Sequence, residues 1–318
     1  MKNTLHTRID VHGHYFPPAY DAMLDRRGLT VLDGGFPRPK WSAEAQLALM
    51  ERLGISFAAL SISSPHLHMG DAAEAVETAR ACNEFGAALV KQYPDRFGLM
   101  ASLPLPEADA AVREVRHCRE ALHADGFTLP TNSRGVYLGD ARLEAVMAEM
   151  NSAPTVAVIH PTAPSAVPQG VTERMPLPFM EFFFDTTRAV LNLILSGTVQ
   201  RYPNIRFVVP HAGAFLPILA DRIIPMAHML SPDGSVDVAG GLKSLYYDLA
   251  GTAMPKQYGN LLQLADKTHL LYGSDTPFTP TEMARQLADA MDERLGPDMA
   301  ELVYRKNPLT LFPRLAGK

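Results

Sequence analysis

The sequence predicts an α/β fold of the (β/α)8 barrel type. Eight short apolar runs occur along the 318 residues, and helical patterns separate most of them. The runs are almost continuously apolar, as is typical of parallel strands covered on both faces. No segment of linker composition divides the chain. We therefore expect one barrel domain over residues 1–318, with a long loop insertion around 161–184.

The eight apolar runs are the predicted strands of the barrel. Because a parallel pair needs a long crossover, usually a helix, the alternation favours parallel pairing throughout. The predicted strands cover residues 8–12, 56–62, 97–103, 126–129, 155–160, 205–210, 245–249 and 269–274.

Helix signals in the first half of the chain lie between these runs. Ser42 is a good N-cap for a helix that ends near Leu53, with Glu44 in its first turn and Gly54 as the stop. Further helices are expected from about 71 to 93 and from about 106 onward. The Pro-rich stretch after the first strand is expected to be a rigid loop.

The second half continues the alternation. Asp140 is expected to cap a helix that ends near Met150, and Asp185 and Phe215 mark the starts of two more. Residues 161–184 are rich in Pro and Phe and lack a clear period, so we expect a loop there. The portion after Asp275 is expected to be helical with Pro breaks.

Composition excludes several classes of protein. The net charge of −5 and the scattered basic residues give no reason to expect nucleic acid as a partner. No apolar run reaches the roughly 20 residues that a membrane helix needs, and the polar residues 1–4 do not resemble a signal peptide. Cys82 and Cys118 fall at helical spacing among apolar residues, where they are expected to be core. We predict a cytoplasmic protein without membrane association.

The first strand ends in a histidine pair, His12 and His14. Alternate residues of a strand point to the same side, so the two imidazoles would project side by side. Two such rings can hold one metal ion. A lone pair is weak support, because 11 histidines make chance pairs common.

Similar residues stand at the ends of three other predicted strands, and they strengthen this interpretation. His160, His211 and Asp275 each follow an apolar run directly. In (β/α)8 barrels the active site lies at the carboxyl ends of the strands, so all five side chains would share one face. Metal binding explains this convergence better than five unrelated strand ends do.

A second pair, His66 and His68, lies in the loop after the second strand. We interpret these residues as solvent-exposed loop histidines, with a substrate contact as the alternative.

These motifs together resemble the amidohydrolase superfamily. The residues that carry the resemblance are Asp10-Val11-His12-Gly13-His14, His160-Pro161, His211-Ala212-Gly213 and Gly273-Ser274-Asp275-Thr276-Pro277-Phe278. The pattern is most similar to the branch of aminocarboxymuconate-semialdehyde decarboxylase, which includes the γ-resorcylate, 5-carboxyvanillate and 6-methylsalicylate decarboxylases. The 6-methylsalicylate decarboxylases are the nearest expected relatives.

The resemblance implies an enzyme with one divalent metal ion and no organic cofactor. His12, His14, His160 and Asp275 would be the ligands, with zinc expected first and manganese as the alternative. His211 would be the catalytic histidine beside the metal. The branch also implies a homodimer. Arg222 matches a position where a neighbouring subunit can help line the site. No lysine ends the fourth strand, which favours a single metal over a binuclear centre.

One residue departs from the branch pattern and bears on the substrate. Gln46 stands where the aminocarboxymuconate enzyme has an arginine that binds a substrate carboxylate. A neutral amide cannot make the charge-assisted bidentate pair of an arginine. The expected substrate is therefore a small aromatic monocarboxylic acid of the salicylate type. Tyr15, Phe278 and the run of three phenylalanines at 182–184 are candidates for the apolar walls of its pocket.

The predicted reaction is non-oxidative decarboxylation, with release of CO2. A nearby acid must protonate the ring carbon before the carboxylate leaves, and the sequence does not choose between Asp275 and His211 for this role. Two alternatives stay open. The same ligand set serves a hydrolase or hydratase acting on a lactone, amide or unsaturated acid. A barrel without chemistry that serves as a scaffold is the other, and the five polar strand ends argue against it.

Overall fold

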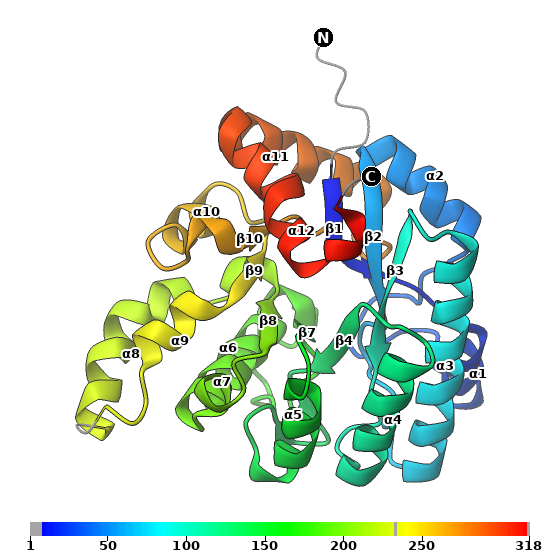
Figure 1. The fold of residues 1–318 in the computed structure, drawn as a ribbon, viewed down its shortest axis with the longest axis horizontal. Helices are drawn as coiled ribbons and strands as arrows, with labels where there is room; N and C mark the ends of the chain where they lie inside the picture. The colour runs from blue at the N-terminus through cyan, green and yellow to red at the C-terminus, as the bar shows by residue number, and fades with distance from the viewer. Residues whose placement is uncertain (1–7, 232–233, 317–318) are drawn as a thin grey trace.

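The computed structural model describes residues 8–231 and 234–316 as a barrel of eight parallel strands surrounded by helices (Figure 1). The strand order is β1-β2-β3-β4-β7-β8-β9-β10, so each strand pairs with the next strand of the barrel along the chain. The predicted fold class is thus confirmed. The polar residues 1–4 lie outside the described part. No helix within the described residues is long and apolar enough to cross a membrane.

The strands lie close to their predicted positions. The barrel consists of β1 (Arg8–His14), β2 (Ile55–Ser61), β3 (Phe97–Ser102), β4 (Gly126–Pro130), β7 (Thr155–His160), β8 (Ile205–Val209), β9 (Tyr246–Asp248) and β10 (Leu270–Leu271). A short antiparallel pair, β5 (Asn132–Ser133) and β6 (Val136–Tyr137), follows β4 outside the barrel.

The barrel closes between its first and last strands. Val11 donates its backbone N–H to the Tyr272 carbonyl at 3.0 Å, and His14 donates to the Thr276 carbonyl at 2.8 Å. Parallel bridges join Asp10 to Tyr272 and Gly13 to Thr276. The ends of β1 and β10 are therefore held side by side, which brings the first and last polar strand ends together.

A bulge in β1 determines which of its side chains enter the barrel. The register between β1 and β2 shifts from Asp10 opposite Ala58 to Gly13 opposite Leu60, so three residues of β1 span two of β2. Such an extra residue changes the face to which the following side chains point. Ile9 and Val11 belong to the apolar interior, whereas the histidines beyond the bulge turn into the barrel mouth.

Helices cover the outer face of the barrel (Figure 1). They are α1 (Pro18–Arg26), α2 (Ala43–Leu53), α3 (Ala72–Gln92), α4 (Ala108–Glu120), α5 (Glu144–Asn151), α6 (Glu181–Leu195), α7 (Thr198–Arg201), α8 (Leu216–Leu230), α9 (Val238–Ser244), α10 (Lys256–Leu261), α11 (Thr281–Glu301) and α12 (Asn307–Leu311). Buried apolar side chains between the strands and these helices form the larger core, and both Cys82 and Cys118 are buried within it.

The predicted caps are present where local signals are strong. The Ser42 side chain accepts from the Ala45 N–H at the start of α2, and Gly54 ends the helix in the left-handed conformation, with φ 64°. Two helix starts differ from the prediction. Helix α1 begins at Pro18, where the expected rigid loop instead uses proline as the first helical residue. Helix α6 begins at Glu181, four residues before Asp185.

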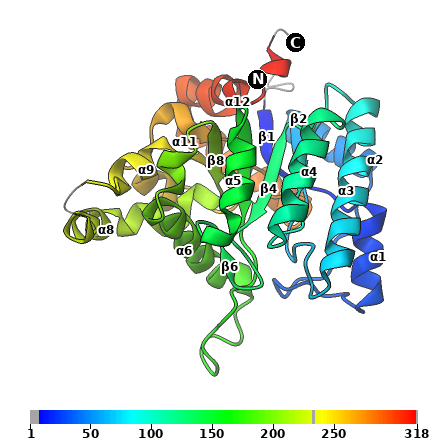
Figure 2. The same ribbon diagram turned by 60° about the horizontal axis from the view of Figure 1, so that its bottom comes forward.

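Loops on the carboxyl-end face contact one another above the barrel mouth. Asp33 accepts hydrogen bonds from the Ser64 hydroxyl and from the Ala163 N–H, at 3.1 Å, which joins three separate loops. Phe36 and Phe179 pack edge to face, with ring centroids 6.0 Å apart. The segment between β7 and α6 extends beyond the rest of the fold (Figure 2). This loop contains most of the predicted insertion.

Candidate metal centre

Four of the predicted residues meet at the carboxyl ends of the strands. His12 and His14 end β1, His160 ends β7, and Asp275 follows β10. One ligand atom from each lies within 4.8 Å of every other, and the three histidines are buried. The barrel thus brings together side chains from the start, the middle and the end of the sequence.

Each of the three histidines is held through its Nδ1 atom. His12 Nδ1 lies 2.8 Å from Asp248 Oδ2, and His160 Nδ1 lies 2.8 Å from the Pro161 carbonyl. His14 Nδ1 lies 3.3 Å from the Ser61 carbonyl and 3.1 Å from the Ser61 hydroxyl, which itself donates to the Gly13 carbonyl. Because carbonyl and carboxylate oxygens only accept, Nδ1 of each ring carries a proton, and Nε2 of His14 and His160 presents a lone pair to the cluster. Burial lowers the pKa of His12, but Asp248 outweighs it and raises that pKa to about 9, so a bound cation would displace the proton on His12 Nε2.

The inner atoms of the cluster fit a divalent cation. Nε2 of His12 and Nε2 of His14 are buried and have no hydrogen-bond partner among the described residues. Asp275 Oδ1 lies 3.6 Å from the first and 3.2 Å from the second. Three imidazole nitrogens and one carboxylate oxygen form a donor set that suits zinc, manganese, iron or cobalt.

Electrostatics at the cluster favours positive charge at its centre. Burial lowers the pKa of His14, and burial reinforced by neighbouring His14 and His12 holds the pKa of His160 well below its ordinary value. Both rings are therefore neutral near pH 7, with lone pairs free to bind a cation. Burial opposes ionisation of Asp275, but His14 and His211 hold its pKa well below its ordinary value. Asp275 therefore contributes a negative charge.

His211 lies beside the four-residue cluster. Its Nε2 atom is 3.5 Å from Asp275 Oδ2, on the carboxylate oxygen that does not face His14. Its ring centroid is 5.2 Å from that of His12. The Phe183 ring stacks on it at 5.6 Å with an interplanar angle of 21°. His211 therefore contacts the cluster through Asp275 and is held in orientation by a neighbouring aromatic ring.

The backbone around His211 is unusual. Four successive residues, His211 to Ala214, have positive φ values of 55°, 53°, 78° and 52°. Non-glycine residues seldom adopt this region, and such conformations are maintained only where surrounding contacts hold them. Asp275 also has a positive φ, of 54°. His211 and Asp275, which approach each other, thus both project from strained turns.

Asp248 also belongs to this site, although it was not among the predicted residues. It is the last residue of β9 and is buried. Besides accepting from His12, it accepts from the backbone N–H groups of His211 and Ala250 through Oδ1, at 2.9 and 3.0 Å. The sequence signal was present, since Asp248 is a carboxylate in an apolar run, but Leu249 and Ala250 follow it and hide the end of the strand.

The predicted apolar contacts divide into two groups. Phe278 lies at the cluster, with its ring 5.5 Å from that of His14, and Phe16 packs on it at 5.8 Å. Tyr15 points away from the cluster into the layer beneath α3, where its hydroxyl donates to the Cys82 carbonyl at 3.1 Å. Its position gives no support to a substrate contact.

The three phenylalanines at 182–184 lie at the start of α6 and differ in environment. Phe183 stacks on His211, Phe182 is buried, and Phe184 is exposed and packs on Phe215. Only Phe183 therefore contacts one of the predicted site residues directly.

Gln46 and Arg222, the other predicted substrate contacts, lie on helices. Gln46 is buried on α2, where its Oε1 accepts from the Trp41 indole at 3.3 Å and its Nε2 has no partner among the described residues. Arg222 is exposed on α8. Among the described residues, neither forms a hydrogen bond or ion pair with the four-residue cluster.

The interpretation of the second histidine pair was wrong. His66 is buried, neither of its ring nitrogens has a hydrogen-bond partner within the described part of the chain, and burial lowers its pKa to about 4. The His68 side chain is also largely buried, and its Nε2 lies 3.2 Å from Glu107. Folding of the loop against the barrel removes both rings from solvent, which the polar loop composition did not indicate.

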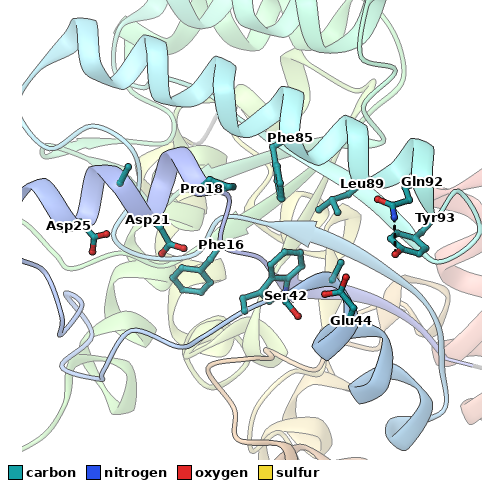
Figure 3. Close-up of a pocket in the computed structure, with 13 residues that line it drawn as sticks. Phe16, Pro18, Asp21, Asp25, Ser42, Glu44, Phe85, Leu89, Gln92 and Tyr93 are labelled. Atoms are coloured by element: carbon teal, nitrogen blue, oxygen red, sulfur yellow. Dashed lines mark hydrogen bonds between the residues drawn. The ribbon is translucent and has the colours of Figure 1, made fainter.

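A cavity of about 570 Å³ lies outside the barrel, between α1, α2 and α3 (Figure 3). Its walls combine apolar side chains, such as Phe16, Trp41 and Phe85, with polar ones that include Asp21, Asp25 and Glu44. It shares no residue with the metal cluster. The four predicted metal ligands therefore lie at the barrel mouth and not in this cavity.

The family model described as amidohydrolase matches residues 9–314, which is nearly the whole described chain. The chain belongs to the amidohydrolase family. A 6-methylsalicylic acid decarboxylase from Penicillium expansum is 32% identical, and the alignment covers 98% of this chain and 97% of that protein.

Solved structures agree with this assignment. This amidohydrolase superposes on the crystal structure of an amidohydrolase II with a TM-score of 0.92 and 39% identity, over 96% of this chain and 99% of that one. The structure of a dihydroxybenzoic acid decarboxylase from Polaromonas, with bound manganese and 2-nitroresorcinol, gives a TM-score of 0.80 and 19% identity, covering 97% of each chain. At that identity the second likeness shows the fold alone.

Proposed function

We propose that this amidohydrolase is a metal-dependent carboxy-lyase that removes CO2 from a small aromatic carboxylic acid without an organic cofactor. The observation that carries the proposal is the convergence of three Nε2 atoms and one carboxylate on a single point beside His211. The curated relative that decarboxylates 6-methylsalicylic acid supports a salicylate-type substrate. It also favours decarboxylation over the hydrolase or hydratase alternative.

His12, His14, His160 and Asp275 are the proposed ligands of one divalent ion. When bound, the ion supplies a Lewis acid that fixes the substrate carboxylate and its ortho oxygen and stabilises negative charge. The residues around it orient and protonate the substrate. The Asp275 side chain is 21% exposed, against 5% for that of His12 and 0% for that of His14. Substrate is therefore expected to approach from the side of Asp275.

His211 is the proposed proton donor. Decarboxylation requires a proton on the ring carbon before the C–C bond breaks, so that the electron pair of that bond restores the aromatic ring as CO2 leaves. Asp275 Oδ1 faces His12 and His14, whereas its Oδ2 faces His211. This division supports Asp275 as a metal ligand and His211 as the group that carries and delivers the proton.

The decisive experiment is a substrate panel. Metal-loaded protein should release CO2 from salicylate-type acids, and benzoic acids without an ortho hydroxyl should react far more slowly, because they cannot complete the chelate. Product analysis by mass spectrometry and a CO2 assay give the readout. Lactone or amide hydrolysis, or water addition to an unsaturated acid, without CO2 release would overturn the proposal.

We propose that Gln46 makes the enzyme prefer monocarboxylic acids to substrates with a second carboxylate. The Nε2 atom of Gln46, which has no partner among the described residues, can donate hydrogen bonds, but it carries no charge to pair with a carboxylate. We expect Gln46→Arg to lower kcat/KM for salicylate-type acids and to raise the relative kcat/KM for matched dicarboxylates about tenfold or more, the size of one charge-assisted hydrogen bond.

The comparison for Gln46 needs a control for loss of the native amide. Gln46→Met keeps the length of the native residue and removes its hydrogen bonds. If Arg and Met at position 46 changed both substrate classes by the same factor, the residue would act through packing alone and the assignment would fail.

The identity of the metal and the homodimer are further parts of the proposal. The donor set of three imidazoles and one carboxylate suits Mn²⁺ as well as the expected zinc, and a neighbour of the same fold contains manganese. Exposed apolar side chains on α8, those of Ile218, Met226 and Met229, support a homodimer with α8 at its interface. Arg222 on the same helix would then reach the partner's site. The cytoplasmic location stays a prediction.

A further inference from the structure

Asp248 contacts two parts of the site at once. Oδ2 lies 2.8 Å from the ring Nδ1 of His12, and Oδ1 accepts from the His211 backbone N–H at 2.9 Å. The carboxylate is buried, and β8 and β10 flank its strand. A charged group held in this place is costly unless its hydrogen bonds are satisfied.

We propose that Asp248 is a positioning residue that fixes the proton of His12 on Nδ1, and so frees its Nε2 for metal, while it anchors the turn that presents His211. The proposal rests on the proposed metal site. It adds one carboxylate that positions both a proposed metal ligand, His12, and the proposed proton donor, His211. Neither of its oxygens needs to touch metal or substrate for this role.

The contact at His12 determines the tautomer of that ring. A carboxylate oxygen only accepts, so the hydrogen bond requires a proton on Nδ1. The remaining lone pair is then on Nε2, which lies 3.6 Å from Asp275 Oδ1 in the cluster. Partners of this kind orient metal-binding histidines and increase their basicity.

The contact at His211 acts on a strained backbone. His211 is the first of four residues with positive φ, and Oδ1 accepts the N–H at the entrance to this turn. The same oxygen accepts from Ala250, so it has two donors. This arrangement determines how an amide would sit in place of the carboxylate.

Asp248→Asn is the variant that tests the proposal. The amide oxygen must take the place of Oδ1, because the NH2 group cannot face two backbone N–H donors. The NH2 group then faces His12 Nδ1 and donates to it. His12 must move its proton to Nε2, where the proton blocks the metal.

We expect Asp248→Asn to weaken divalent metal binding by about 10–100-fold in a competition titration with a chelator, the range typical for loss of such a partner. The titration measures metal binding alone and needs no substrate. Failure of the decarboxylase proposal therefore leaves the result interpretable. Unchanged metal affinity in the folded variant would overturn the inference.

Asp185→Asn is the matched control. Asp185 is also fully buried and accepts from Thr131, Asn132 and Tyr137, none of which is a proposed ligand. We expect this variant to lose stability and to keep its metal affinity. Equal weakening of metal binding in both variants would assign the effect to general destabilisation and refute the proposal.

A measurement on the native protein covers the case in which Asp248→Asn does not fold. Histidine-selective ¹⁵N NMR of the zinc-loaded protein reports which ring nitrogen of His12 carries the proton. We expect protonated Nδ1 and metal-bound Nε2. An Nδ1 atom without a proton, or bound to zinc, would contradict the inference directly.

Discussion

Replacement of His14 by alanine is expected to leave a folded barrel that binds no divalent ion and releases no CO2. His14 is fully buried, and its Nε2 atom has no hydrogen-bond partner among the described residues. Loss of one of four ligands should remove most of the affinity for metal. The native protein should carry about one ion per chain by elemental analysis, and the variant much less than one.

Thermal unfolding provides a second measurement for this prediction. A ligand that binds only the folded state stabilises it by RT ln(1 + [L]/Kd), which is about 2.7 kcal/mol at 100 times Kd. Added metal should therefore raise the Tm of the metal-depleted native protein and leave that of His14→Ala unchanged. His117→Ala, at a partly exposed histidine on α4, is the control and should bind metal as the native protein does. A native protein that takes up no metal would refute the proposed site.

Replacement of His211 by asparagine is expected to lower kcat by about 10²–10⁴-fold, the usual contribution of a general acid or base. Metal content should stay near that of the native protein, because His211 contacts Asp275 and is not one of the four converging ligands. Asparagine is the better substitution because it tolerates positive φ, whereas alanine at 55° would add backbone strain.

Steady-state kinetics and metal analysis together separate three outcomes for this variant. Full metal content with a large loss of kcat supports His211 as the proton donor. Loss of the metal would make His211 a ligand, and unchanged kcat would make it structural. Phe183→Leu provides a related control, since it removes the ring stacked on His211 without removing the imidazole, and it should lower kcat less.

The eight strands and the five polar strand ends could be predicted because both depend on local pattern. An apolar run that stops at His160 or Asp275 is visible in the sequence, and the barrel places such ends together. The bulge in β1 was not predictable in the same way. Simple alternation predicts that His12 and His14 lie on the same face of the strand. It also predicts the opposite face for Ile9 and Val11, and only the register shift after Asp10 lets all four side chains face the inside of the barrel.

Features that depend on tertiary contacts were missed or misjudged. Asp248 was overlooked because its role arises from its distance to His12, which lies 236 positions away. His66 carries no local sign that a loop would enclose it. Tyr15 was expected at the pocket because it follows His14, yet the alternation that favours His14 directs its neighbour to the layer beneath α3.

The closure of the barrel through β1 and β10 has a consequence for biosynthesis. The Ser274 hydroxyl donates to Asp10 across 264 positions of the chain, so this junction and Asp275 beside it are made long after His12 and His14. A nascent chain interrupted before that point has an open first strand and an incomplete ligand set. Since main-chain hydrogen bonds seal the junction, the barrel can close before any ion arrives. We therefore expect the metal to bind only after Asp275 has been made, so that metal supply to the finished chain would limit its activity.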